Sequence, residues 1–192
     1  MNKSVLRKLL SFRRASLSST EFAERNSAMI EKLIEVLQQN TFEYVHVFLS
    51  IPHKNEPQTQ PLIDWLLEHR PESKIVVSKS DFKQKRMLSY LYIGQDQLQP
   101  NKLGIPEPID GEVVDSKLLD IVLVPMLGFD TSGHRLGYGQ GFYDRFLANG
   151  CRADVLKIGL SILPPIDNLQ FAEAHDVPLD MCITPFGVFD FQ

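Results

Sequence analysis

Hydrophobic positions recur along the chain in two patterns, which predict helices that alternate with short strands. Ser18 and Glu21 have the spacing of a helix capping box, and apolar residues at helical intervals follow to about residue 38. Pro61 can occupy the first turn of another helix, and a further helix is expected from about Phe142. Short apolar runs predict strands at residues 44–49, 74–77, 87–93, 118–125, 157–162 and 181–184.

This alternation is typical of an α/β sheet that is covered by helices on both faces. The length of 192 residues suits one domain. Residues 94–110 contain three prolines and two glycines and are expected to form a loop. Ligands of such sheets bind in the loops beyond the carboxyl ends of the strands, so we expect the functional residues there.

The first twenty residues carry five basic side chains and no acid, which predicts either a targeting segment or a cationic helix. At about 100° per residue, Lys3, Arg7 and Arg14 project within about 40° of one another. Three apolar side chains lie on the other side of this helix: Val5, Leu9 and Phe12. The stripe of cations is either a solvated surface or an anion-binding rim of a site, and the pattern alone leaves both open.

Composition excludes several functional classes. Hydrophobic residues make up 43% and charged residues 23% of the chain, and the net charge is −4, whereas dedicated nucleic-acid binders show a basic excess. No apolar run reaches the roughly 18 residues that a membrane span needs. Cys151 and Cys182 match no zinc or redox spacing. We therefore expect a reduced, cytoplasmic protein that binds neither nucleic acid nor membrane.

Chemistry concentrates in a glycine-rich stretch between a predicted strand and a predicted helix. Gly133, Gly137, Gly139 and Gly141 are four of the chain's 11 glycines, and Arg135 lies among them. Glycines let backbone N–H groups approach a ligand closely, and a helix N-terminus attracts anions. The stretch matches neither a P-loop nor a dinucleotide-binding fingerprint. It is either a phosphate cradle or a tight structural turn.

At residues 128–144 the sequence resembles the pattern G-F-D-x-x-G-x-R-L-G-x-G-x-G-Y-Y-D of the 5-formyltetrahydrofolate cyclo-ligase family. Residues 3–7, 48–56, 104–108 and 175–180 resemble four further family segments in the same order: K-x-x-L-R, F-L-S with a later E-x-x-T, I-x-E-P and H-D-x-x-x-D. The chain departs from the family in places. Phe142 replaces the usual Tyr, Ser78-Lys79 replaces a frequent Pro-Arg pair, and Leu103 stands where some members have a Trp that stacks on the pterin.

The resemblance implies a single domain over residues 1–192 with the fold of a three-layer α/β/α sandwich. Its central sheet would be mostly parallel, as in the sugar-phosphate isomerase and CoA transferase-like fold. It also implies an ATP-dependent ligase that converts 5-formyltetrahydrofolate to 5,10-methenyltetrahydrofolate with release of ADP and phosphate. MgATP would phosphorylate the formyl oxygen, and N10 of the folate would then close the ring. A substrate with a polyglutamate tail and a monomeric enzyme are further expectations.

Residue roles follow from the resemblance by motif position. Lys3, Arg135 and Asp144 would be catalytic, and Asp144 and Asp176 would hold Mg²⁺. The implied ATP-binding residues are Lys3, Arg7, Arg135, Leu136, Gly137, Tyr138, Gly139, Gln140, Gly141, Phe142 and Tyr143. The implied folate-binding residues are Leu49, Glu56, Tyr138, Gly139, Gln140, Gly141 and Phe142. Arg14 is a weaker candidate for the phosphates, and Lys79 for the anionic folate tail.

Two alternatives to this function stay open at this point. The first is a nucleotide- or folate-binding protein without catalysis, although the joint presence of Lys3, Arg135, Asp144 and Glu56 argues against it. The second is another α/β enzyme on a related scaffold, such as a sugar-phosphate isomerase, which would need no ATP. His46 is interpreted as a residue of the apolar core.

Overall fold

A computed structural model describes residues 2–51, 54–167, 169 and 176–192 of the chain. An eight-stranded sheet runs through the molecule in the order β12-β11-β10-β7-β1-β2-β3-β6. The strands from β11 to β2 are parallel, and β12, β3 and β6 extend the sheet by antiparallel pairing. Their bounds are β1 Tyr44–His46, β2 Lys74–Asp81, β3 Arg86–Leu91, β6 Val113–Val114, β7 Ile121–Pro125, β10 Leu156–Leu160, β11 Met181–Thr184 and β12 Gly187–Asp190.

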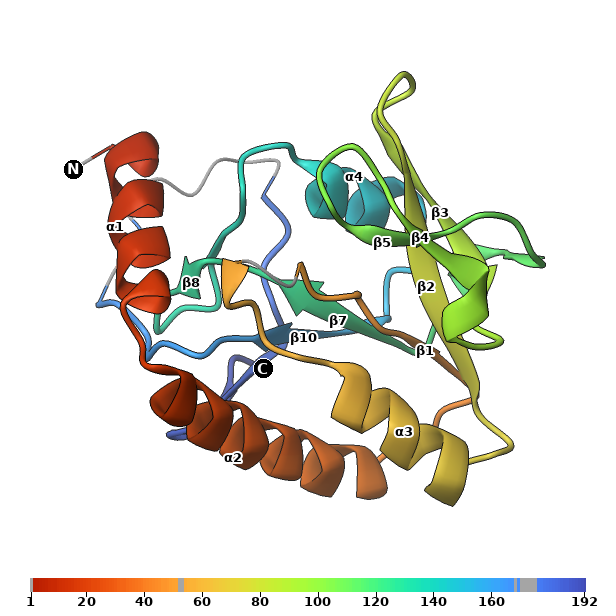
Figure 1. Cartoon of the computed structure of the whole chain (residues 1–192), viewed down its shortest axis with the longest axis horizontal. Coiled ribbons are helices and arrows are strands. Elements are labelled where there is room, and N and C mark those ends of the chain that lie inside the picture. The colour runs from red at the N-terminus through yellow and green to blue at the C-terminus, as the bar shows by residue number, and fades with distance from the viewer. Residues whose placement is uncertain (1, 52–53, 168, 170–175) are drawn as a thin grey trace.

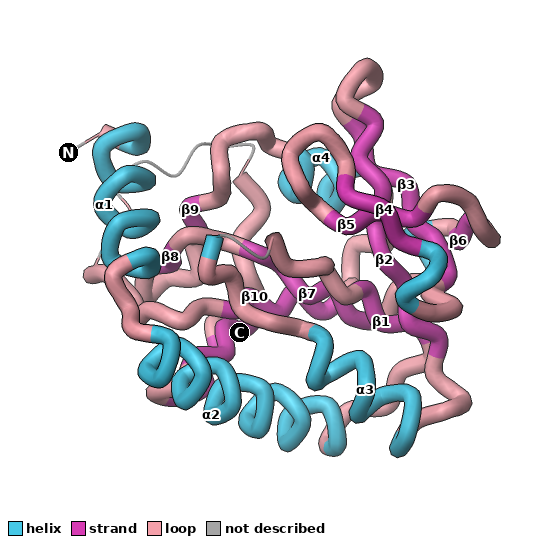
Figure 2. The backbone as a smooth tube through the Cα atoms, in the orientation of Figure 1, coloured by secondary structure: helices cyan, strands magenta, loops and turns pink. Residues whose placement is uncertain are grey.

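Helices cover both faces of the sheet (Figure 1). Two long helices, α2 (Ser19–Gln38) and α3 (Gln60–His69), lie against one face, and α4 (Phe142–Asn149) lies against the other. The capping box forms as expected, because the Ser18 side chain accepts the Glu21 N–H at 3.2 Å. The helix α1 (Lys3–Ala15) stands beside the sheet, as the tube view also shows (Figure 2).

Strand side chains alternate between the two layers of core. Ile121 and Leu123 of β7 pack toward α2 and α3, whereas Val122 and Val124 pack toward α4. The three-layer α/β/α sandwich with a mostly parallel sheet is therefore confirmed. Within the described ranges, no helix is long and apolar enough to cross a membrane.

The packing of α1 decides between the two interpretations of its cationic stripe. Val5, Leu9 and Phe12 are exposed, and the helix instead buries Leu6 and Leu10 against the loops at the carboxyl ends of the strands. Leu6 and Leu10 lie on the same side of the helix as the three cations, so the cationic stripe faces inward. This inward orientation brings α1 to the functional site.

Several helices and strands differ from the sequence prediction in length, and some short elements were not predicted. The predicted strand at 44–49 ends at His46, and β2 continues past the predicted end to Asp81. The expected loop 94–110 contains a short hairpin, because β4 pairs with β5. The remaining short elements are η2 Gln95–Gln97, β4 Leu98–Pro100, β5 Pro106–Pro108, η3 Ser116–Leu118, β8 Gly128–Phe129 and β9 Arg135–Leu136.

Candidate active site

A buried carboxylate shapes the chain just before the glycine-rich loop. Asp130 is 1% exposed and accepts the backbone N–H groups of Ser132, His134 and Leu169 at 2.9–3.0 Å. Burial alone would raise its pKa, but these N–H donors and the His134 side chain hold the pKa of Asp130 below its ordinary value. The tight β8–β9 turn that results delivers Arg135 to the start of the loop.

Two glycines of the loop have backbone conformations that other residues rarely adopt. Gly139 has φ of +92° and Gly141, the N-cap of α4, has φ of +64°. A Cβ at Gly139 would lie 3.1 Å from the Arg7 guanidinium carbon, so the loop and α1 approach closely there. Arg7 Nε also donates to the Gly137 carbonyl at 2.9 Å. Gly137 itself has an ordinary φ and open space around it, and so requires no glycine on these grounds.

Cations and carboxylates from four separate segments meet beside this loop. Arg135 donates to the Asp144 carboxylate and to the Val177 carbonyl, and Lys3 Nζ lies 3.4 Å from the Asp176 carboxylate. Burial lowers the pKa of Arg135, and the charges of Asp144 and Asp176 oppose that shift. Arg135 stays protonated at any physiological pH, so this end of the site presents fixed positive charge to an anion.

Asp144 and Asp176 provide the oxygen donors that Mg²⁺ prefers. The described part of the chain contains no cluster of three or more His, Cys, Asp or Glu side chains that would form a complete metal cage. Mg²⁺ bound to a nucleotide needs only one or two protein carboxylates besides the phosphates. The donor set therefore fits an ion that arrives with ATP.

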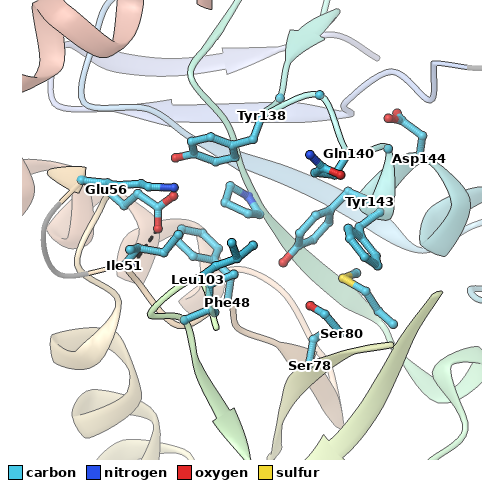
Figure 3. Close-up of a pocket in the computed structure, with 18 of the residues that line it drawn as sticks. Phe48, Ile51, Glu56, Ser78, Ser80, Leu103, Tyr138, Gln140, Tyr143 and Asp144 are labelled. Carbon is cyan, nitrogen blue, oxygen red and sulfur yellow. Dashed lines mark hydrogen bonds between the residues drawn. The ribbon is translucent and has the colours of Figure 1, made fainter. Parts of the chain in front are cut away.

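The opposite end of the site is built around Glu56. This side chain is 4% exposed, and its carboxylate accepts the backbone N–H of Ile51 at 2.8 Å (Figure 3). Tyr138 faces it from the glycine loop; burial and the nearby Glu56 charge raise the pKa of the Tyr138 phenol. A carboxylate fixed in this way can receive N–H donors of a ligand.

Arg14 does not belong to the phosphate end, contrary to the sequence expectation. It is 4% exposed and lies behind Tyr138, to whose hydroxyl it donates at 2.9 Å. Lys79 does not line the cavity either, and its Nζ donates to the Ile109 carbonyl at 2.6 Å. Arg14 thus contacts a residue of the glycine loop, and Lys79 contacts the loop that follows β5.

Both ends belong to one cavity of about 490 Å³. Apart from the weaker candidates Arg14 and Lys79, all residues assigned from the resemblance line it: Lys3, Arg7, Leu49, Glu56, Arg135, Leu136, Gly137, Tyr138, Gly139, Gln140, Gly141, Phe142, Tyr143, Asp144 and Asp176. His175, the first residue of the closing motif, lies outside the described residues. The structure thus brings the assigned residues together, and their roles toward ATP and folate stay predictions.

The cavity is also lined by residues to which no role was assigned from the sequence. Glu107 of β5 is buried and accepts the Ser80 backbone N–H at 2.9 Å, which adds a second carboxylate to the cavity. The segment I-x-E-P pointed to this residue but assigned it no role. Phe48 follows β1 and Ser78 lies within β2; the resemblance to the family covered both positions but gave neither a role at the site. Leu103 lines the cavity with a half-exposed side chain, at the position of the expected stacking Trp.

Known proteins resemble this chain over most of its length. The model of the 5-formyltetrahydrofolate cyclo-ligase family matches residues 1–185. The 5-formyltetrahydrofolate cyclo-ligase of Escherichia coli (strain K12) is 34% identical over 149 residues, which cover 77% of this chain and 80% of that protein. The cyclo-ligase of Haemophilus influenzae is 28% identical over 169 residues, which cover 86% and 88%.

Solved structures agree with the fold. The NMR structure of Aquifex aeolicus 5,10-methenyltetrahydrofolate synthetase matches with a TM-score of 0.81 at 28% identity, covering 100% of this chain and 94% of that chain. A 5,10-methenyltetrahydrofolate synthetase from Mycoplasma pneumoniae matches with a TM-score of 0.77 at 23% identity, covering 96% and 99%. The second likeness bears on the fold alone.

Proposed function

The chain belongs to the 5-formyltetrahydrofolate cyclo-ligase family, and we propose that the cavity described above is where it couples phosphoryl transfer from ATP to folate cyclisation. The overall reaction converts 5-formyltetrahydrofolate and ATP to 5,10-methenyltetrahydrofolate, ADP and phosphate. The observation that carries the proposal is that the cationic glycine loop and the Glu56 slot line one cavity. A reaction between a triphosphate and a pterin needs both ligands side by side.

The reaction proceeds in two chemical steps. The formyl oxygen attacks the γ-phosphorus of ATP, so the new O–P bond replaces the bond to ADP, and an N5-iminium phosphate forms. N10 then attacks the formyl carbon, N10 loses its proton, and phosphate departs with the former formyl oxygen. Phosphate is a far better leaving group than oxide or hydroxide. The protein has to align the reactants and stabilise negative charge, and needs no covalent nucleophile.

The phosphate end of the cavity binds ATP in this proposal. Lys3 and Arg7 reach it from α1, and Arg135 reaches it from β9. Backbone N–H groups of residues 137–141 and the N-terminus of α4 add partial positive charge. Because Arg7 also donates to the Gly137 carbonyl, α1 and the loop close on the triphosphate as one unit.

Asp144 and Asp176 are the proposed ligands of Mg²⁺. When bound, the ion neutralises charge on the β- and γ-phosphates. Asp144 lies in the first turn of α4 and pairs with Arg135, so the protein fixes this carboxylate before ligands arrive. Asp176 is held beside Lys3. Both carboxylates thus lie next to the cations that would hold the triphosphate.

The pterin occupies the Glu56 end. Its ring N–H and amino groups are donors, and Glu56 has one oxygen held by the Ile51 N–H. Phe48, Leu49 and Leu103 provide apolar surface for the ring. Leu103 can pack against the pterin in the absence of an aromatic stacking partner at this position.

The folate tail leaves the cavity past the β2–β3 hairpin in this proposal. Phe82 lines the cavity near the tip of the hairpin, and Lys83, Lys85 and Arg86 are exposed beside it. These cations attract an anionic tail, and a polyglutamate tail more strongly. We further propose that the enzyme works as a monomer, because one chain lines the cavity, and that it is cytoplasmic, which suits its two free cysteines.

The direct test is a turnover assay on the purified chain with 5-formyltetrahydrofolate, ATP and Mg²⁺. Methenyl absorbance and ADP should appear together in equal amounts, and omission of either substrate should stop both. ADP release without folate would indicate an unrelated ATPase. Conversion without ATP would indicate an isomerase-like enzyme, and either result would overturn the proposal.

A further inference from the structure

Beneath the cavity, a buried histidine is hydrogen-bonded to a serine that lines it. His46 of β1 is 0% exposed and lies between the rings of Tyr143 and Phe146, whose centroids are 5.9 and 5.5 Å away. Its Nε2 lies 2.6 Å from the Ser78 hydroxyl oxygen. Ser78 and Ser80 follow one another on the same side of β2, and both line the cavity, across from Tyr138 in Figure 3.

The surroundings of His46 fix the direction of this hydrogen bond. Burial lowers the pKa of His46 to about 4, so the ring is neutral at physiological pH and carries one N–H. Backbone groups of Leu123 and of His46 itself act to raise this pKa, as acceptors beside a ring N–H do. Because Nε2 is paired with Ser78, Nδ1 is the ring nitrogen left for these acceptors, and it completes no hydrogen bond with a described residue. The proton therefore sits on Nδ1, and Nε2 is an acceptor.

If Nε2 of His46 is the acceptor, the single hydroxyl hydrogen of Ser78 is used in this hydrogen bond. A serine hydroxyl has one O–H and two lone pairs, so the oxygen of Ser78 can offer the cavity lone pairs alone. A ligand group at this point must therefore be a donor. Ser80 differs, because no side-chain hydrogen bond to another described residue fixes its hydroxyl, while its backbone N–H is held by Glu107.

We propose that Ser78, oriented by His46, accepts a hydrogen bond from N10–H of the folate and so aims the N10 lone pair at the formyl carbon. This inference rests on the function proposed above. N10 joins the pterin to the tail, so its partner should lie between the Glu56 end and the β2–β3 hairpin. Ser78 meets that condition, because β2 runs from it toward Phe82 at the cavity mouth. The family frequently has proline at this position, so the hydroxyl is a feature of this chain.

The test pairs a protein change with a ligand change. The affinities of 5-formyltetrahydrofolate and of its 10-deaza analogue, which has CH₂ in place of N10–H, are measured by calorimetry. The natural chain should prefer the N10–H ligand by about tenfold, the scale of one hydrogen bond plus an unpaired acceptor. Ser78→Ala should bind both ligands alike, whereas Ser78→Thr and the neighbouring control Ser80→Ala should keep the preference.

Loss of the Ser78 hydroxyl leaves a buried nitrogen of His46 unpaired, which can weaken folding. The double variant His46→Leu/Ser78→Ala removes both polar partners and should also bind the two ligands alike. An unchanged tenfold preference in Ser78→Ala or in the double variant overturns this inference. The proposed cyclo-ligase function would still stand after that result. Failure of the natural chain to turn over 5-formyltetrahydrofolate overturns the proposed function, and this inference with it.

Discussion

The two ends of the cavity are built in different ways. The phosphate end consists largely of one continuous stretch, residues 135–144, which is closed by one face of α1. The folate end is assembled from the chain after β1, the hairpin β4–β5 and the end of β2, and its groups are single side chains. Fixed backbone and permanent charge suit a triphosphate, whereas directional side chains suit a heterocycle with distinct donors. We therefore expect substitutions at one end to impair one ligand and spare the other.

The largest effect is expected when α1 loses the cations that reach the cavity. Lys3→Gln with Arg7→Gln removes two positive charges from the γ-phosphate region, and turnover should fall by about 10³-fold or more. The matched control is Lys8→Gln with Arg13→Gln, which removes two exposed cations from the same helix. Steady-state rates of both double variants decide the matter. Equal activity would return α1 to the role of a solvated helix or a targeting segment.

Gly139→Val should weaken ATP binding by about 10²-fold, because φ of +92° disfavours a β-branched residue and the new side chain collides with Arg7. Gly137→Ala is the control, since it has an ordinary φ and open space. Nucleotide titration measures both affinities, and thermal melting confirms that both variants fold. A folded Gly139→Val protein with unchanged ATP affinity would show that the loop is only a structural turn.

The folate end should respond in the opposite sense. Glu56→Gln keeps an oxygen for the Ile51 N–H but loses the charge that receives the pterin donors. The affinity for 5-formyltetrahydrofolate should fall by about 10- to 100-fold, the range for a charged hydrogen bond. ATP affinity, measured on the same sample, should stay within twofold of the natural value, by the scale of remote substitutions. A parallel loss of both affinities would erase the distinction between the two ends.

The smallest of these effects is expected at the proposed Mg²⁺ ligand. Asp144→Asn keeps the size of the side chain and removes its charge, and should lower the maximal rate by about tenfold. The Mg²⁺ concentration for half-maximal rate should rise, while folate binding without nucleotide stays unchanged. Rates measured across a magnesium series provide the comparison. If Asp144→Asn shows the same magnesium dependence as the natural chain, Asp144 serves only as the partner of Arg135, and Asp176 becomes the leading candidate for the Mg²⁺ ligand.

The same contrast explains how much could be predicted from the sequence. The glycine loop was recognisable because its residues are contiguous, and two of its glycines, Gly139 and Gly141, have positive φ. The helix α2 was recognisable from its capping box. Glu107 and Ser78 were not assigned, because their meaning depends on which segments the sheet brings together. Helical spacing placed Lys3, Arg7 and Arg14 on one face of α1, but could not tell that this face, rather than the more apolar one, packs inward.

In the proposed reaction, the formyl oxygen of the folate is the atom that reacts with ATP. The fate of this oxygen therefore tests most directly whether the two ends of the cavity act together. 5-Formyltetrahydrofolate that carries ¹⁸O in the formyl group is turned over with unlabelled ATP, and the products are examined by mass spectrometry. Attack of this oxygen on the γ-phosphorus predicts one ¹⁸O atom in each phosphate released and none in ADP. Unlabelled phosphate, with the label lost to water, would contradict joint action of the two ends on one oxygen.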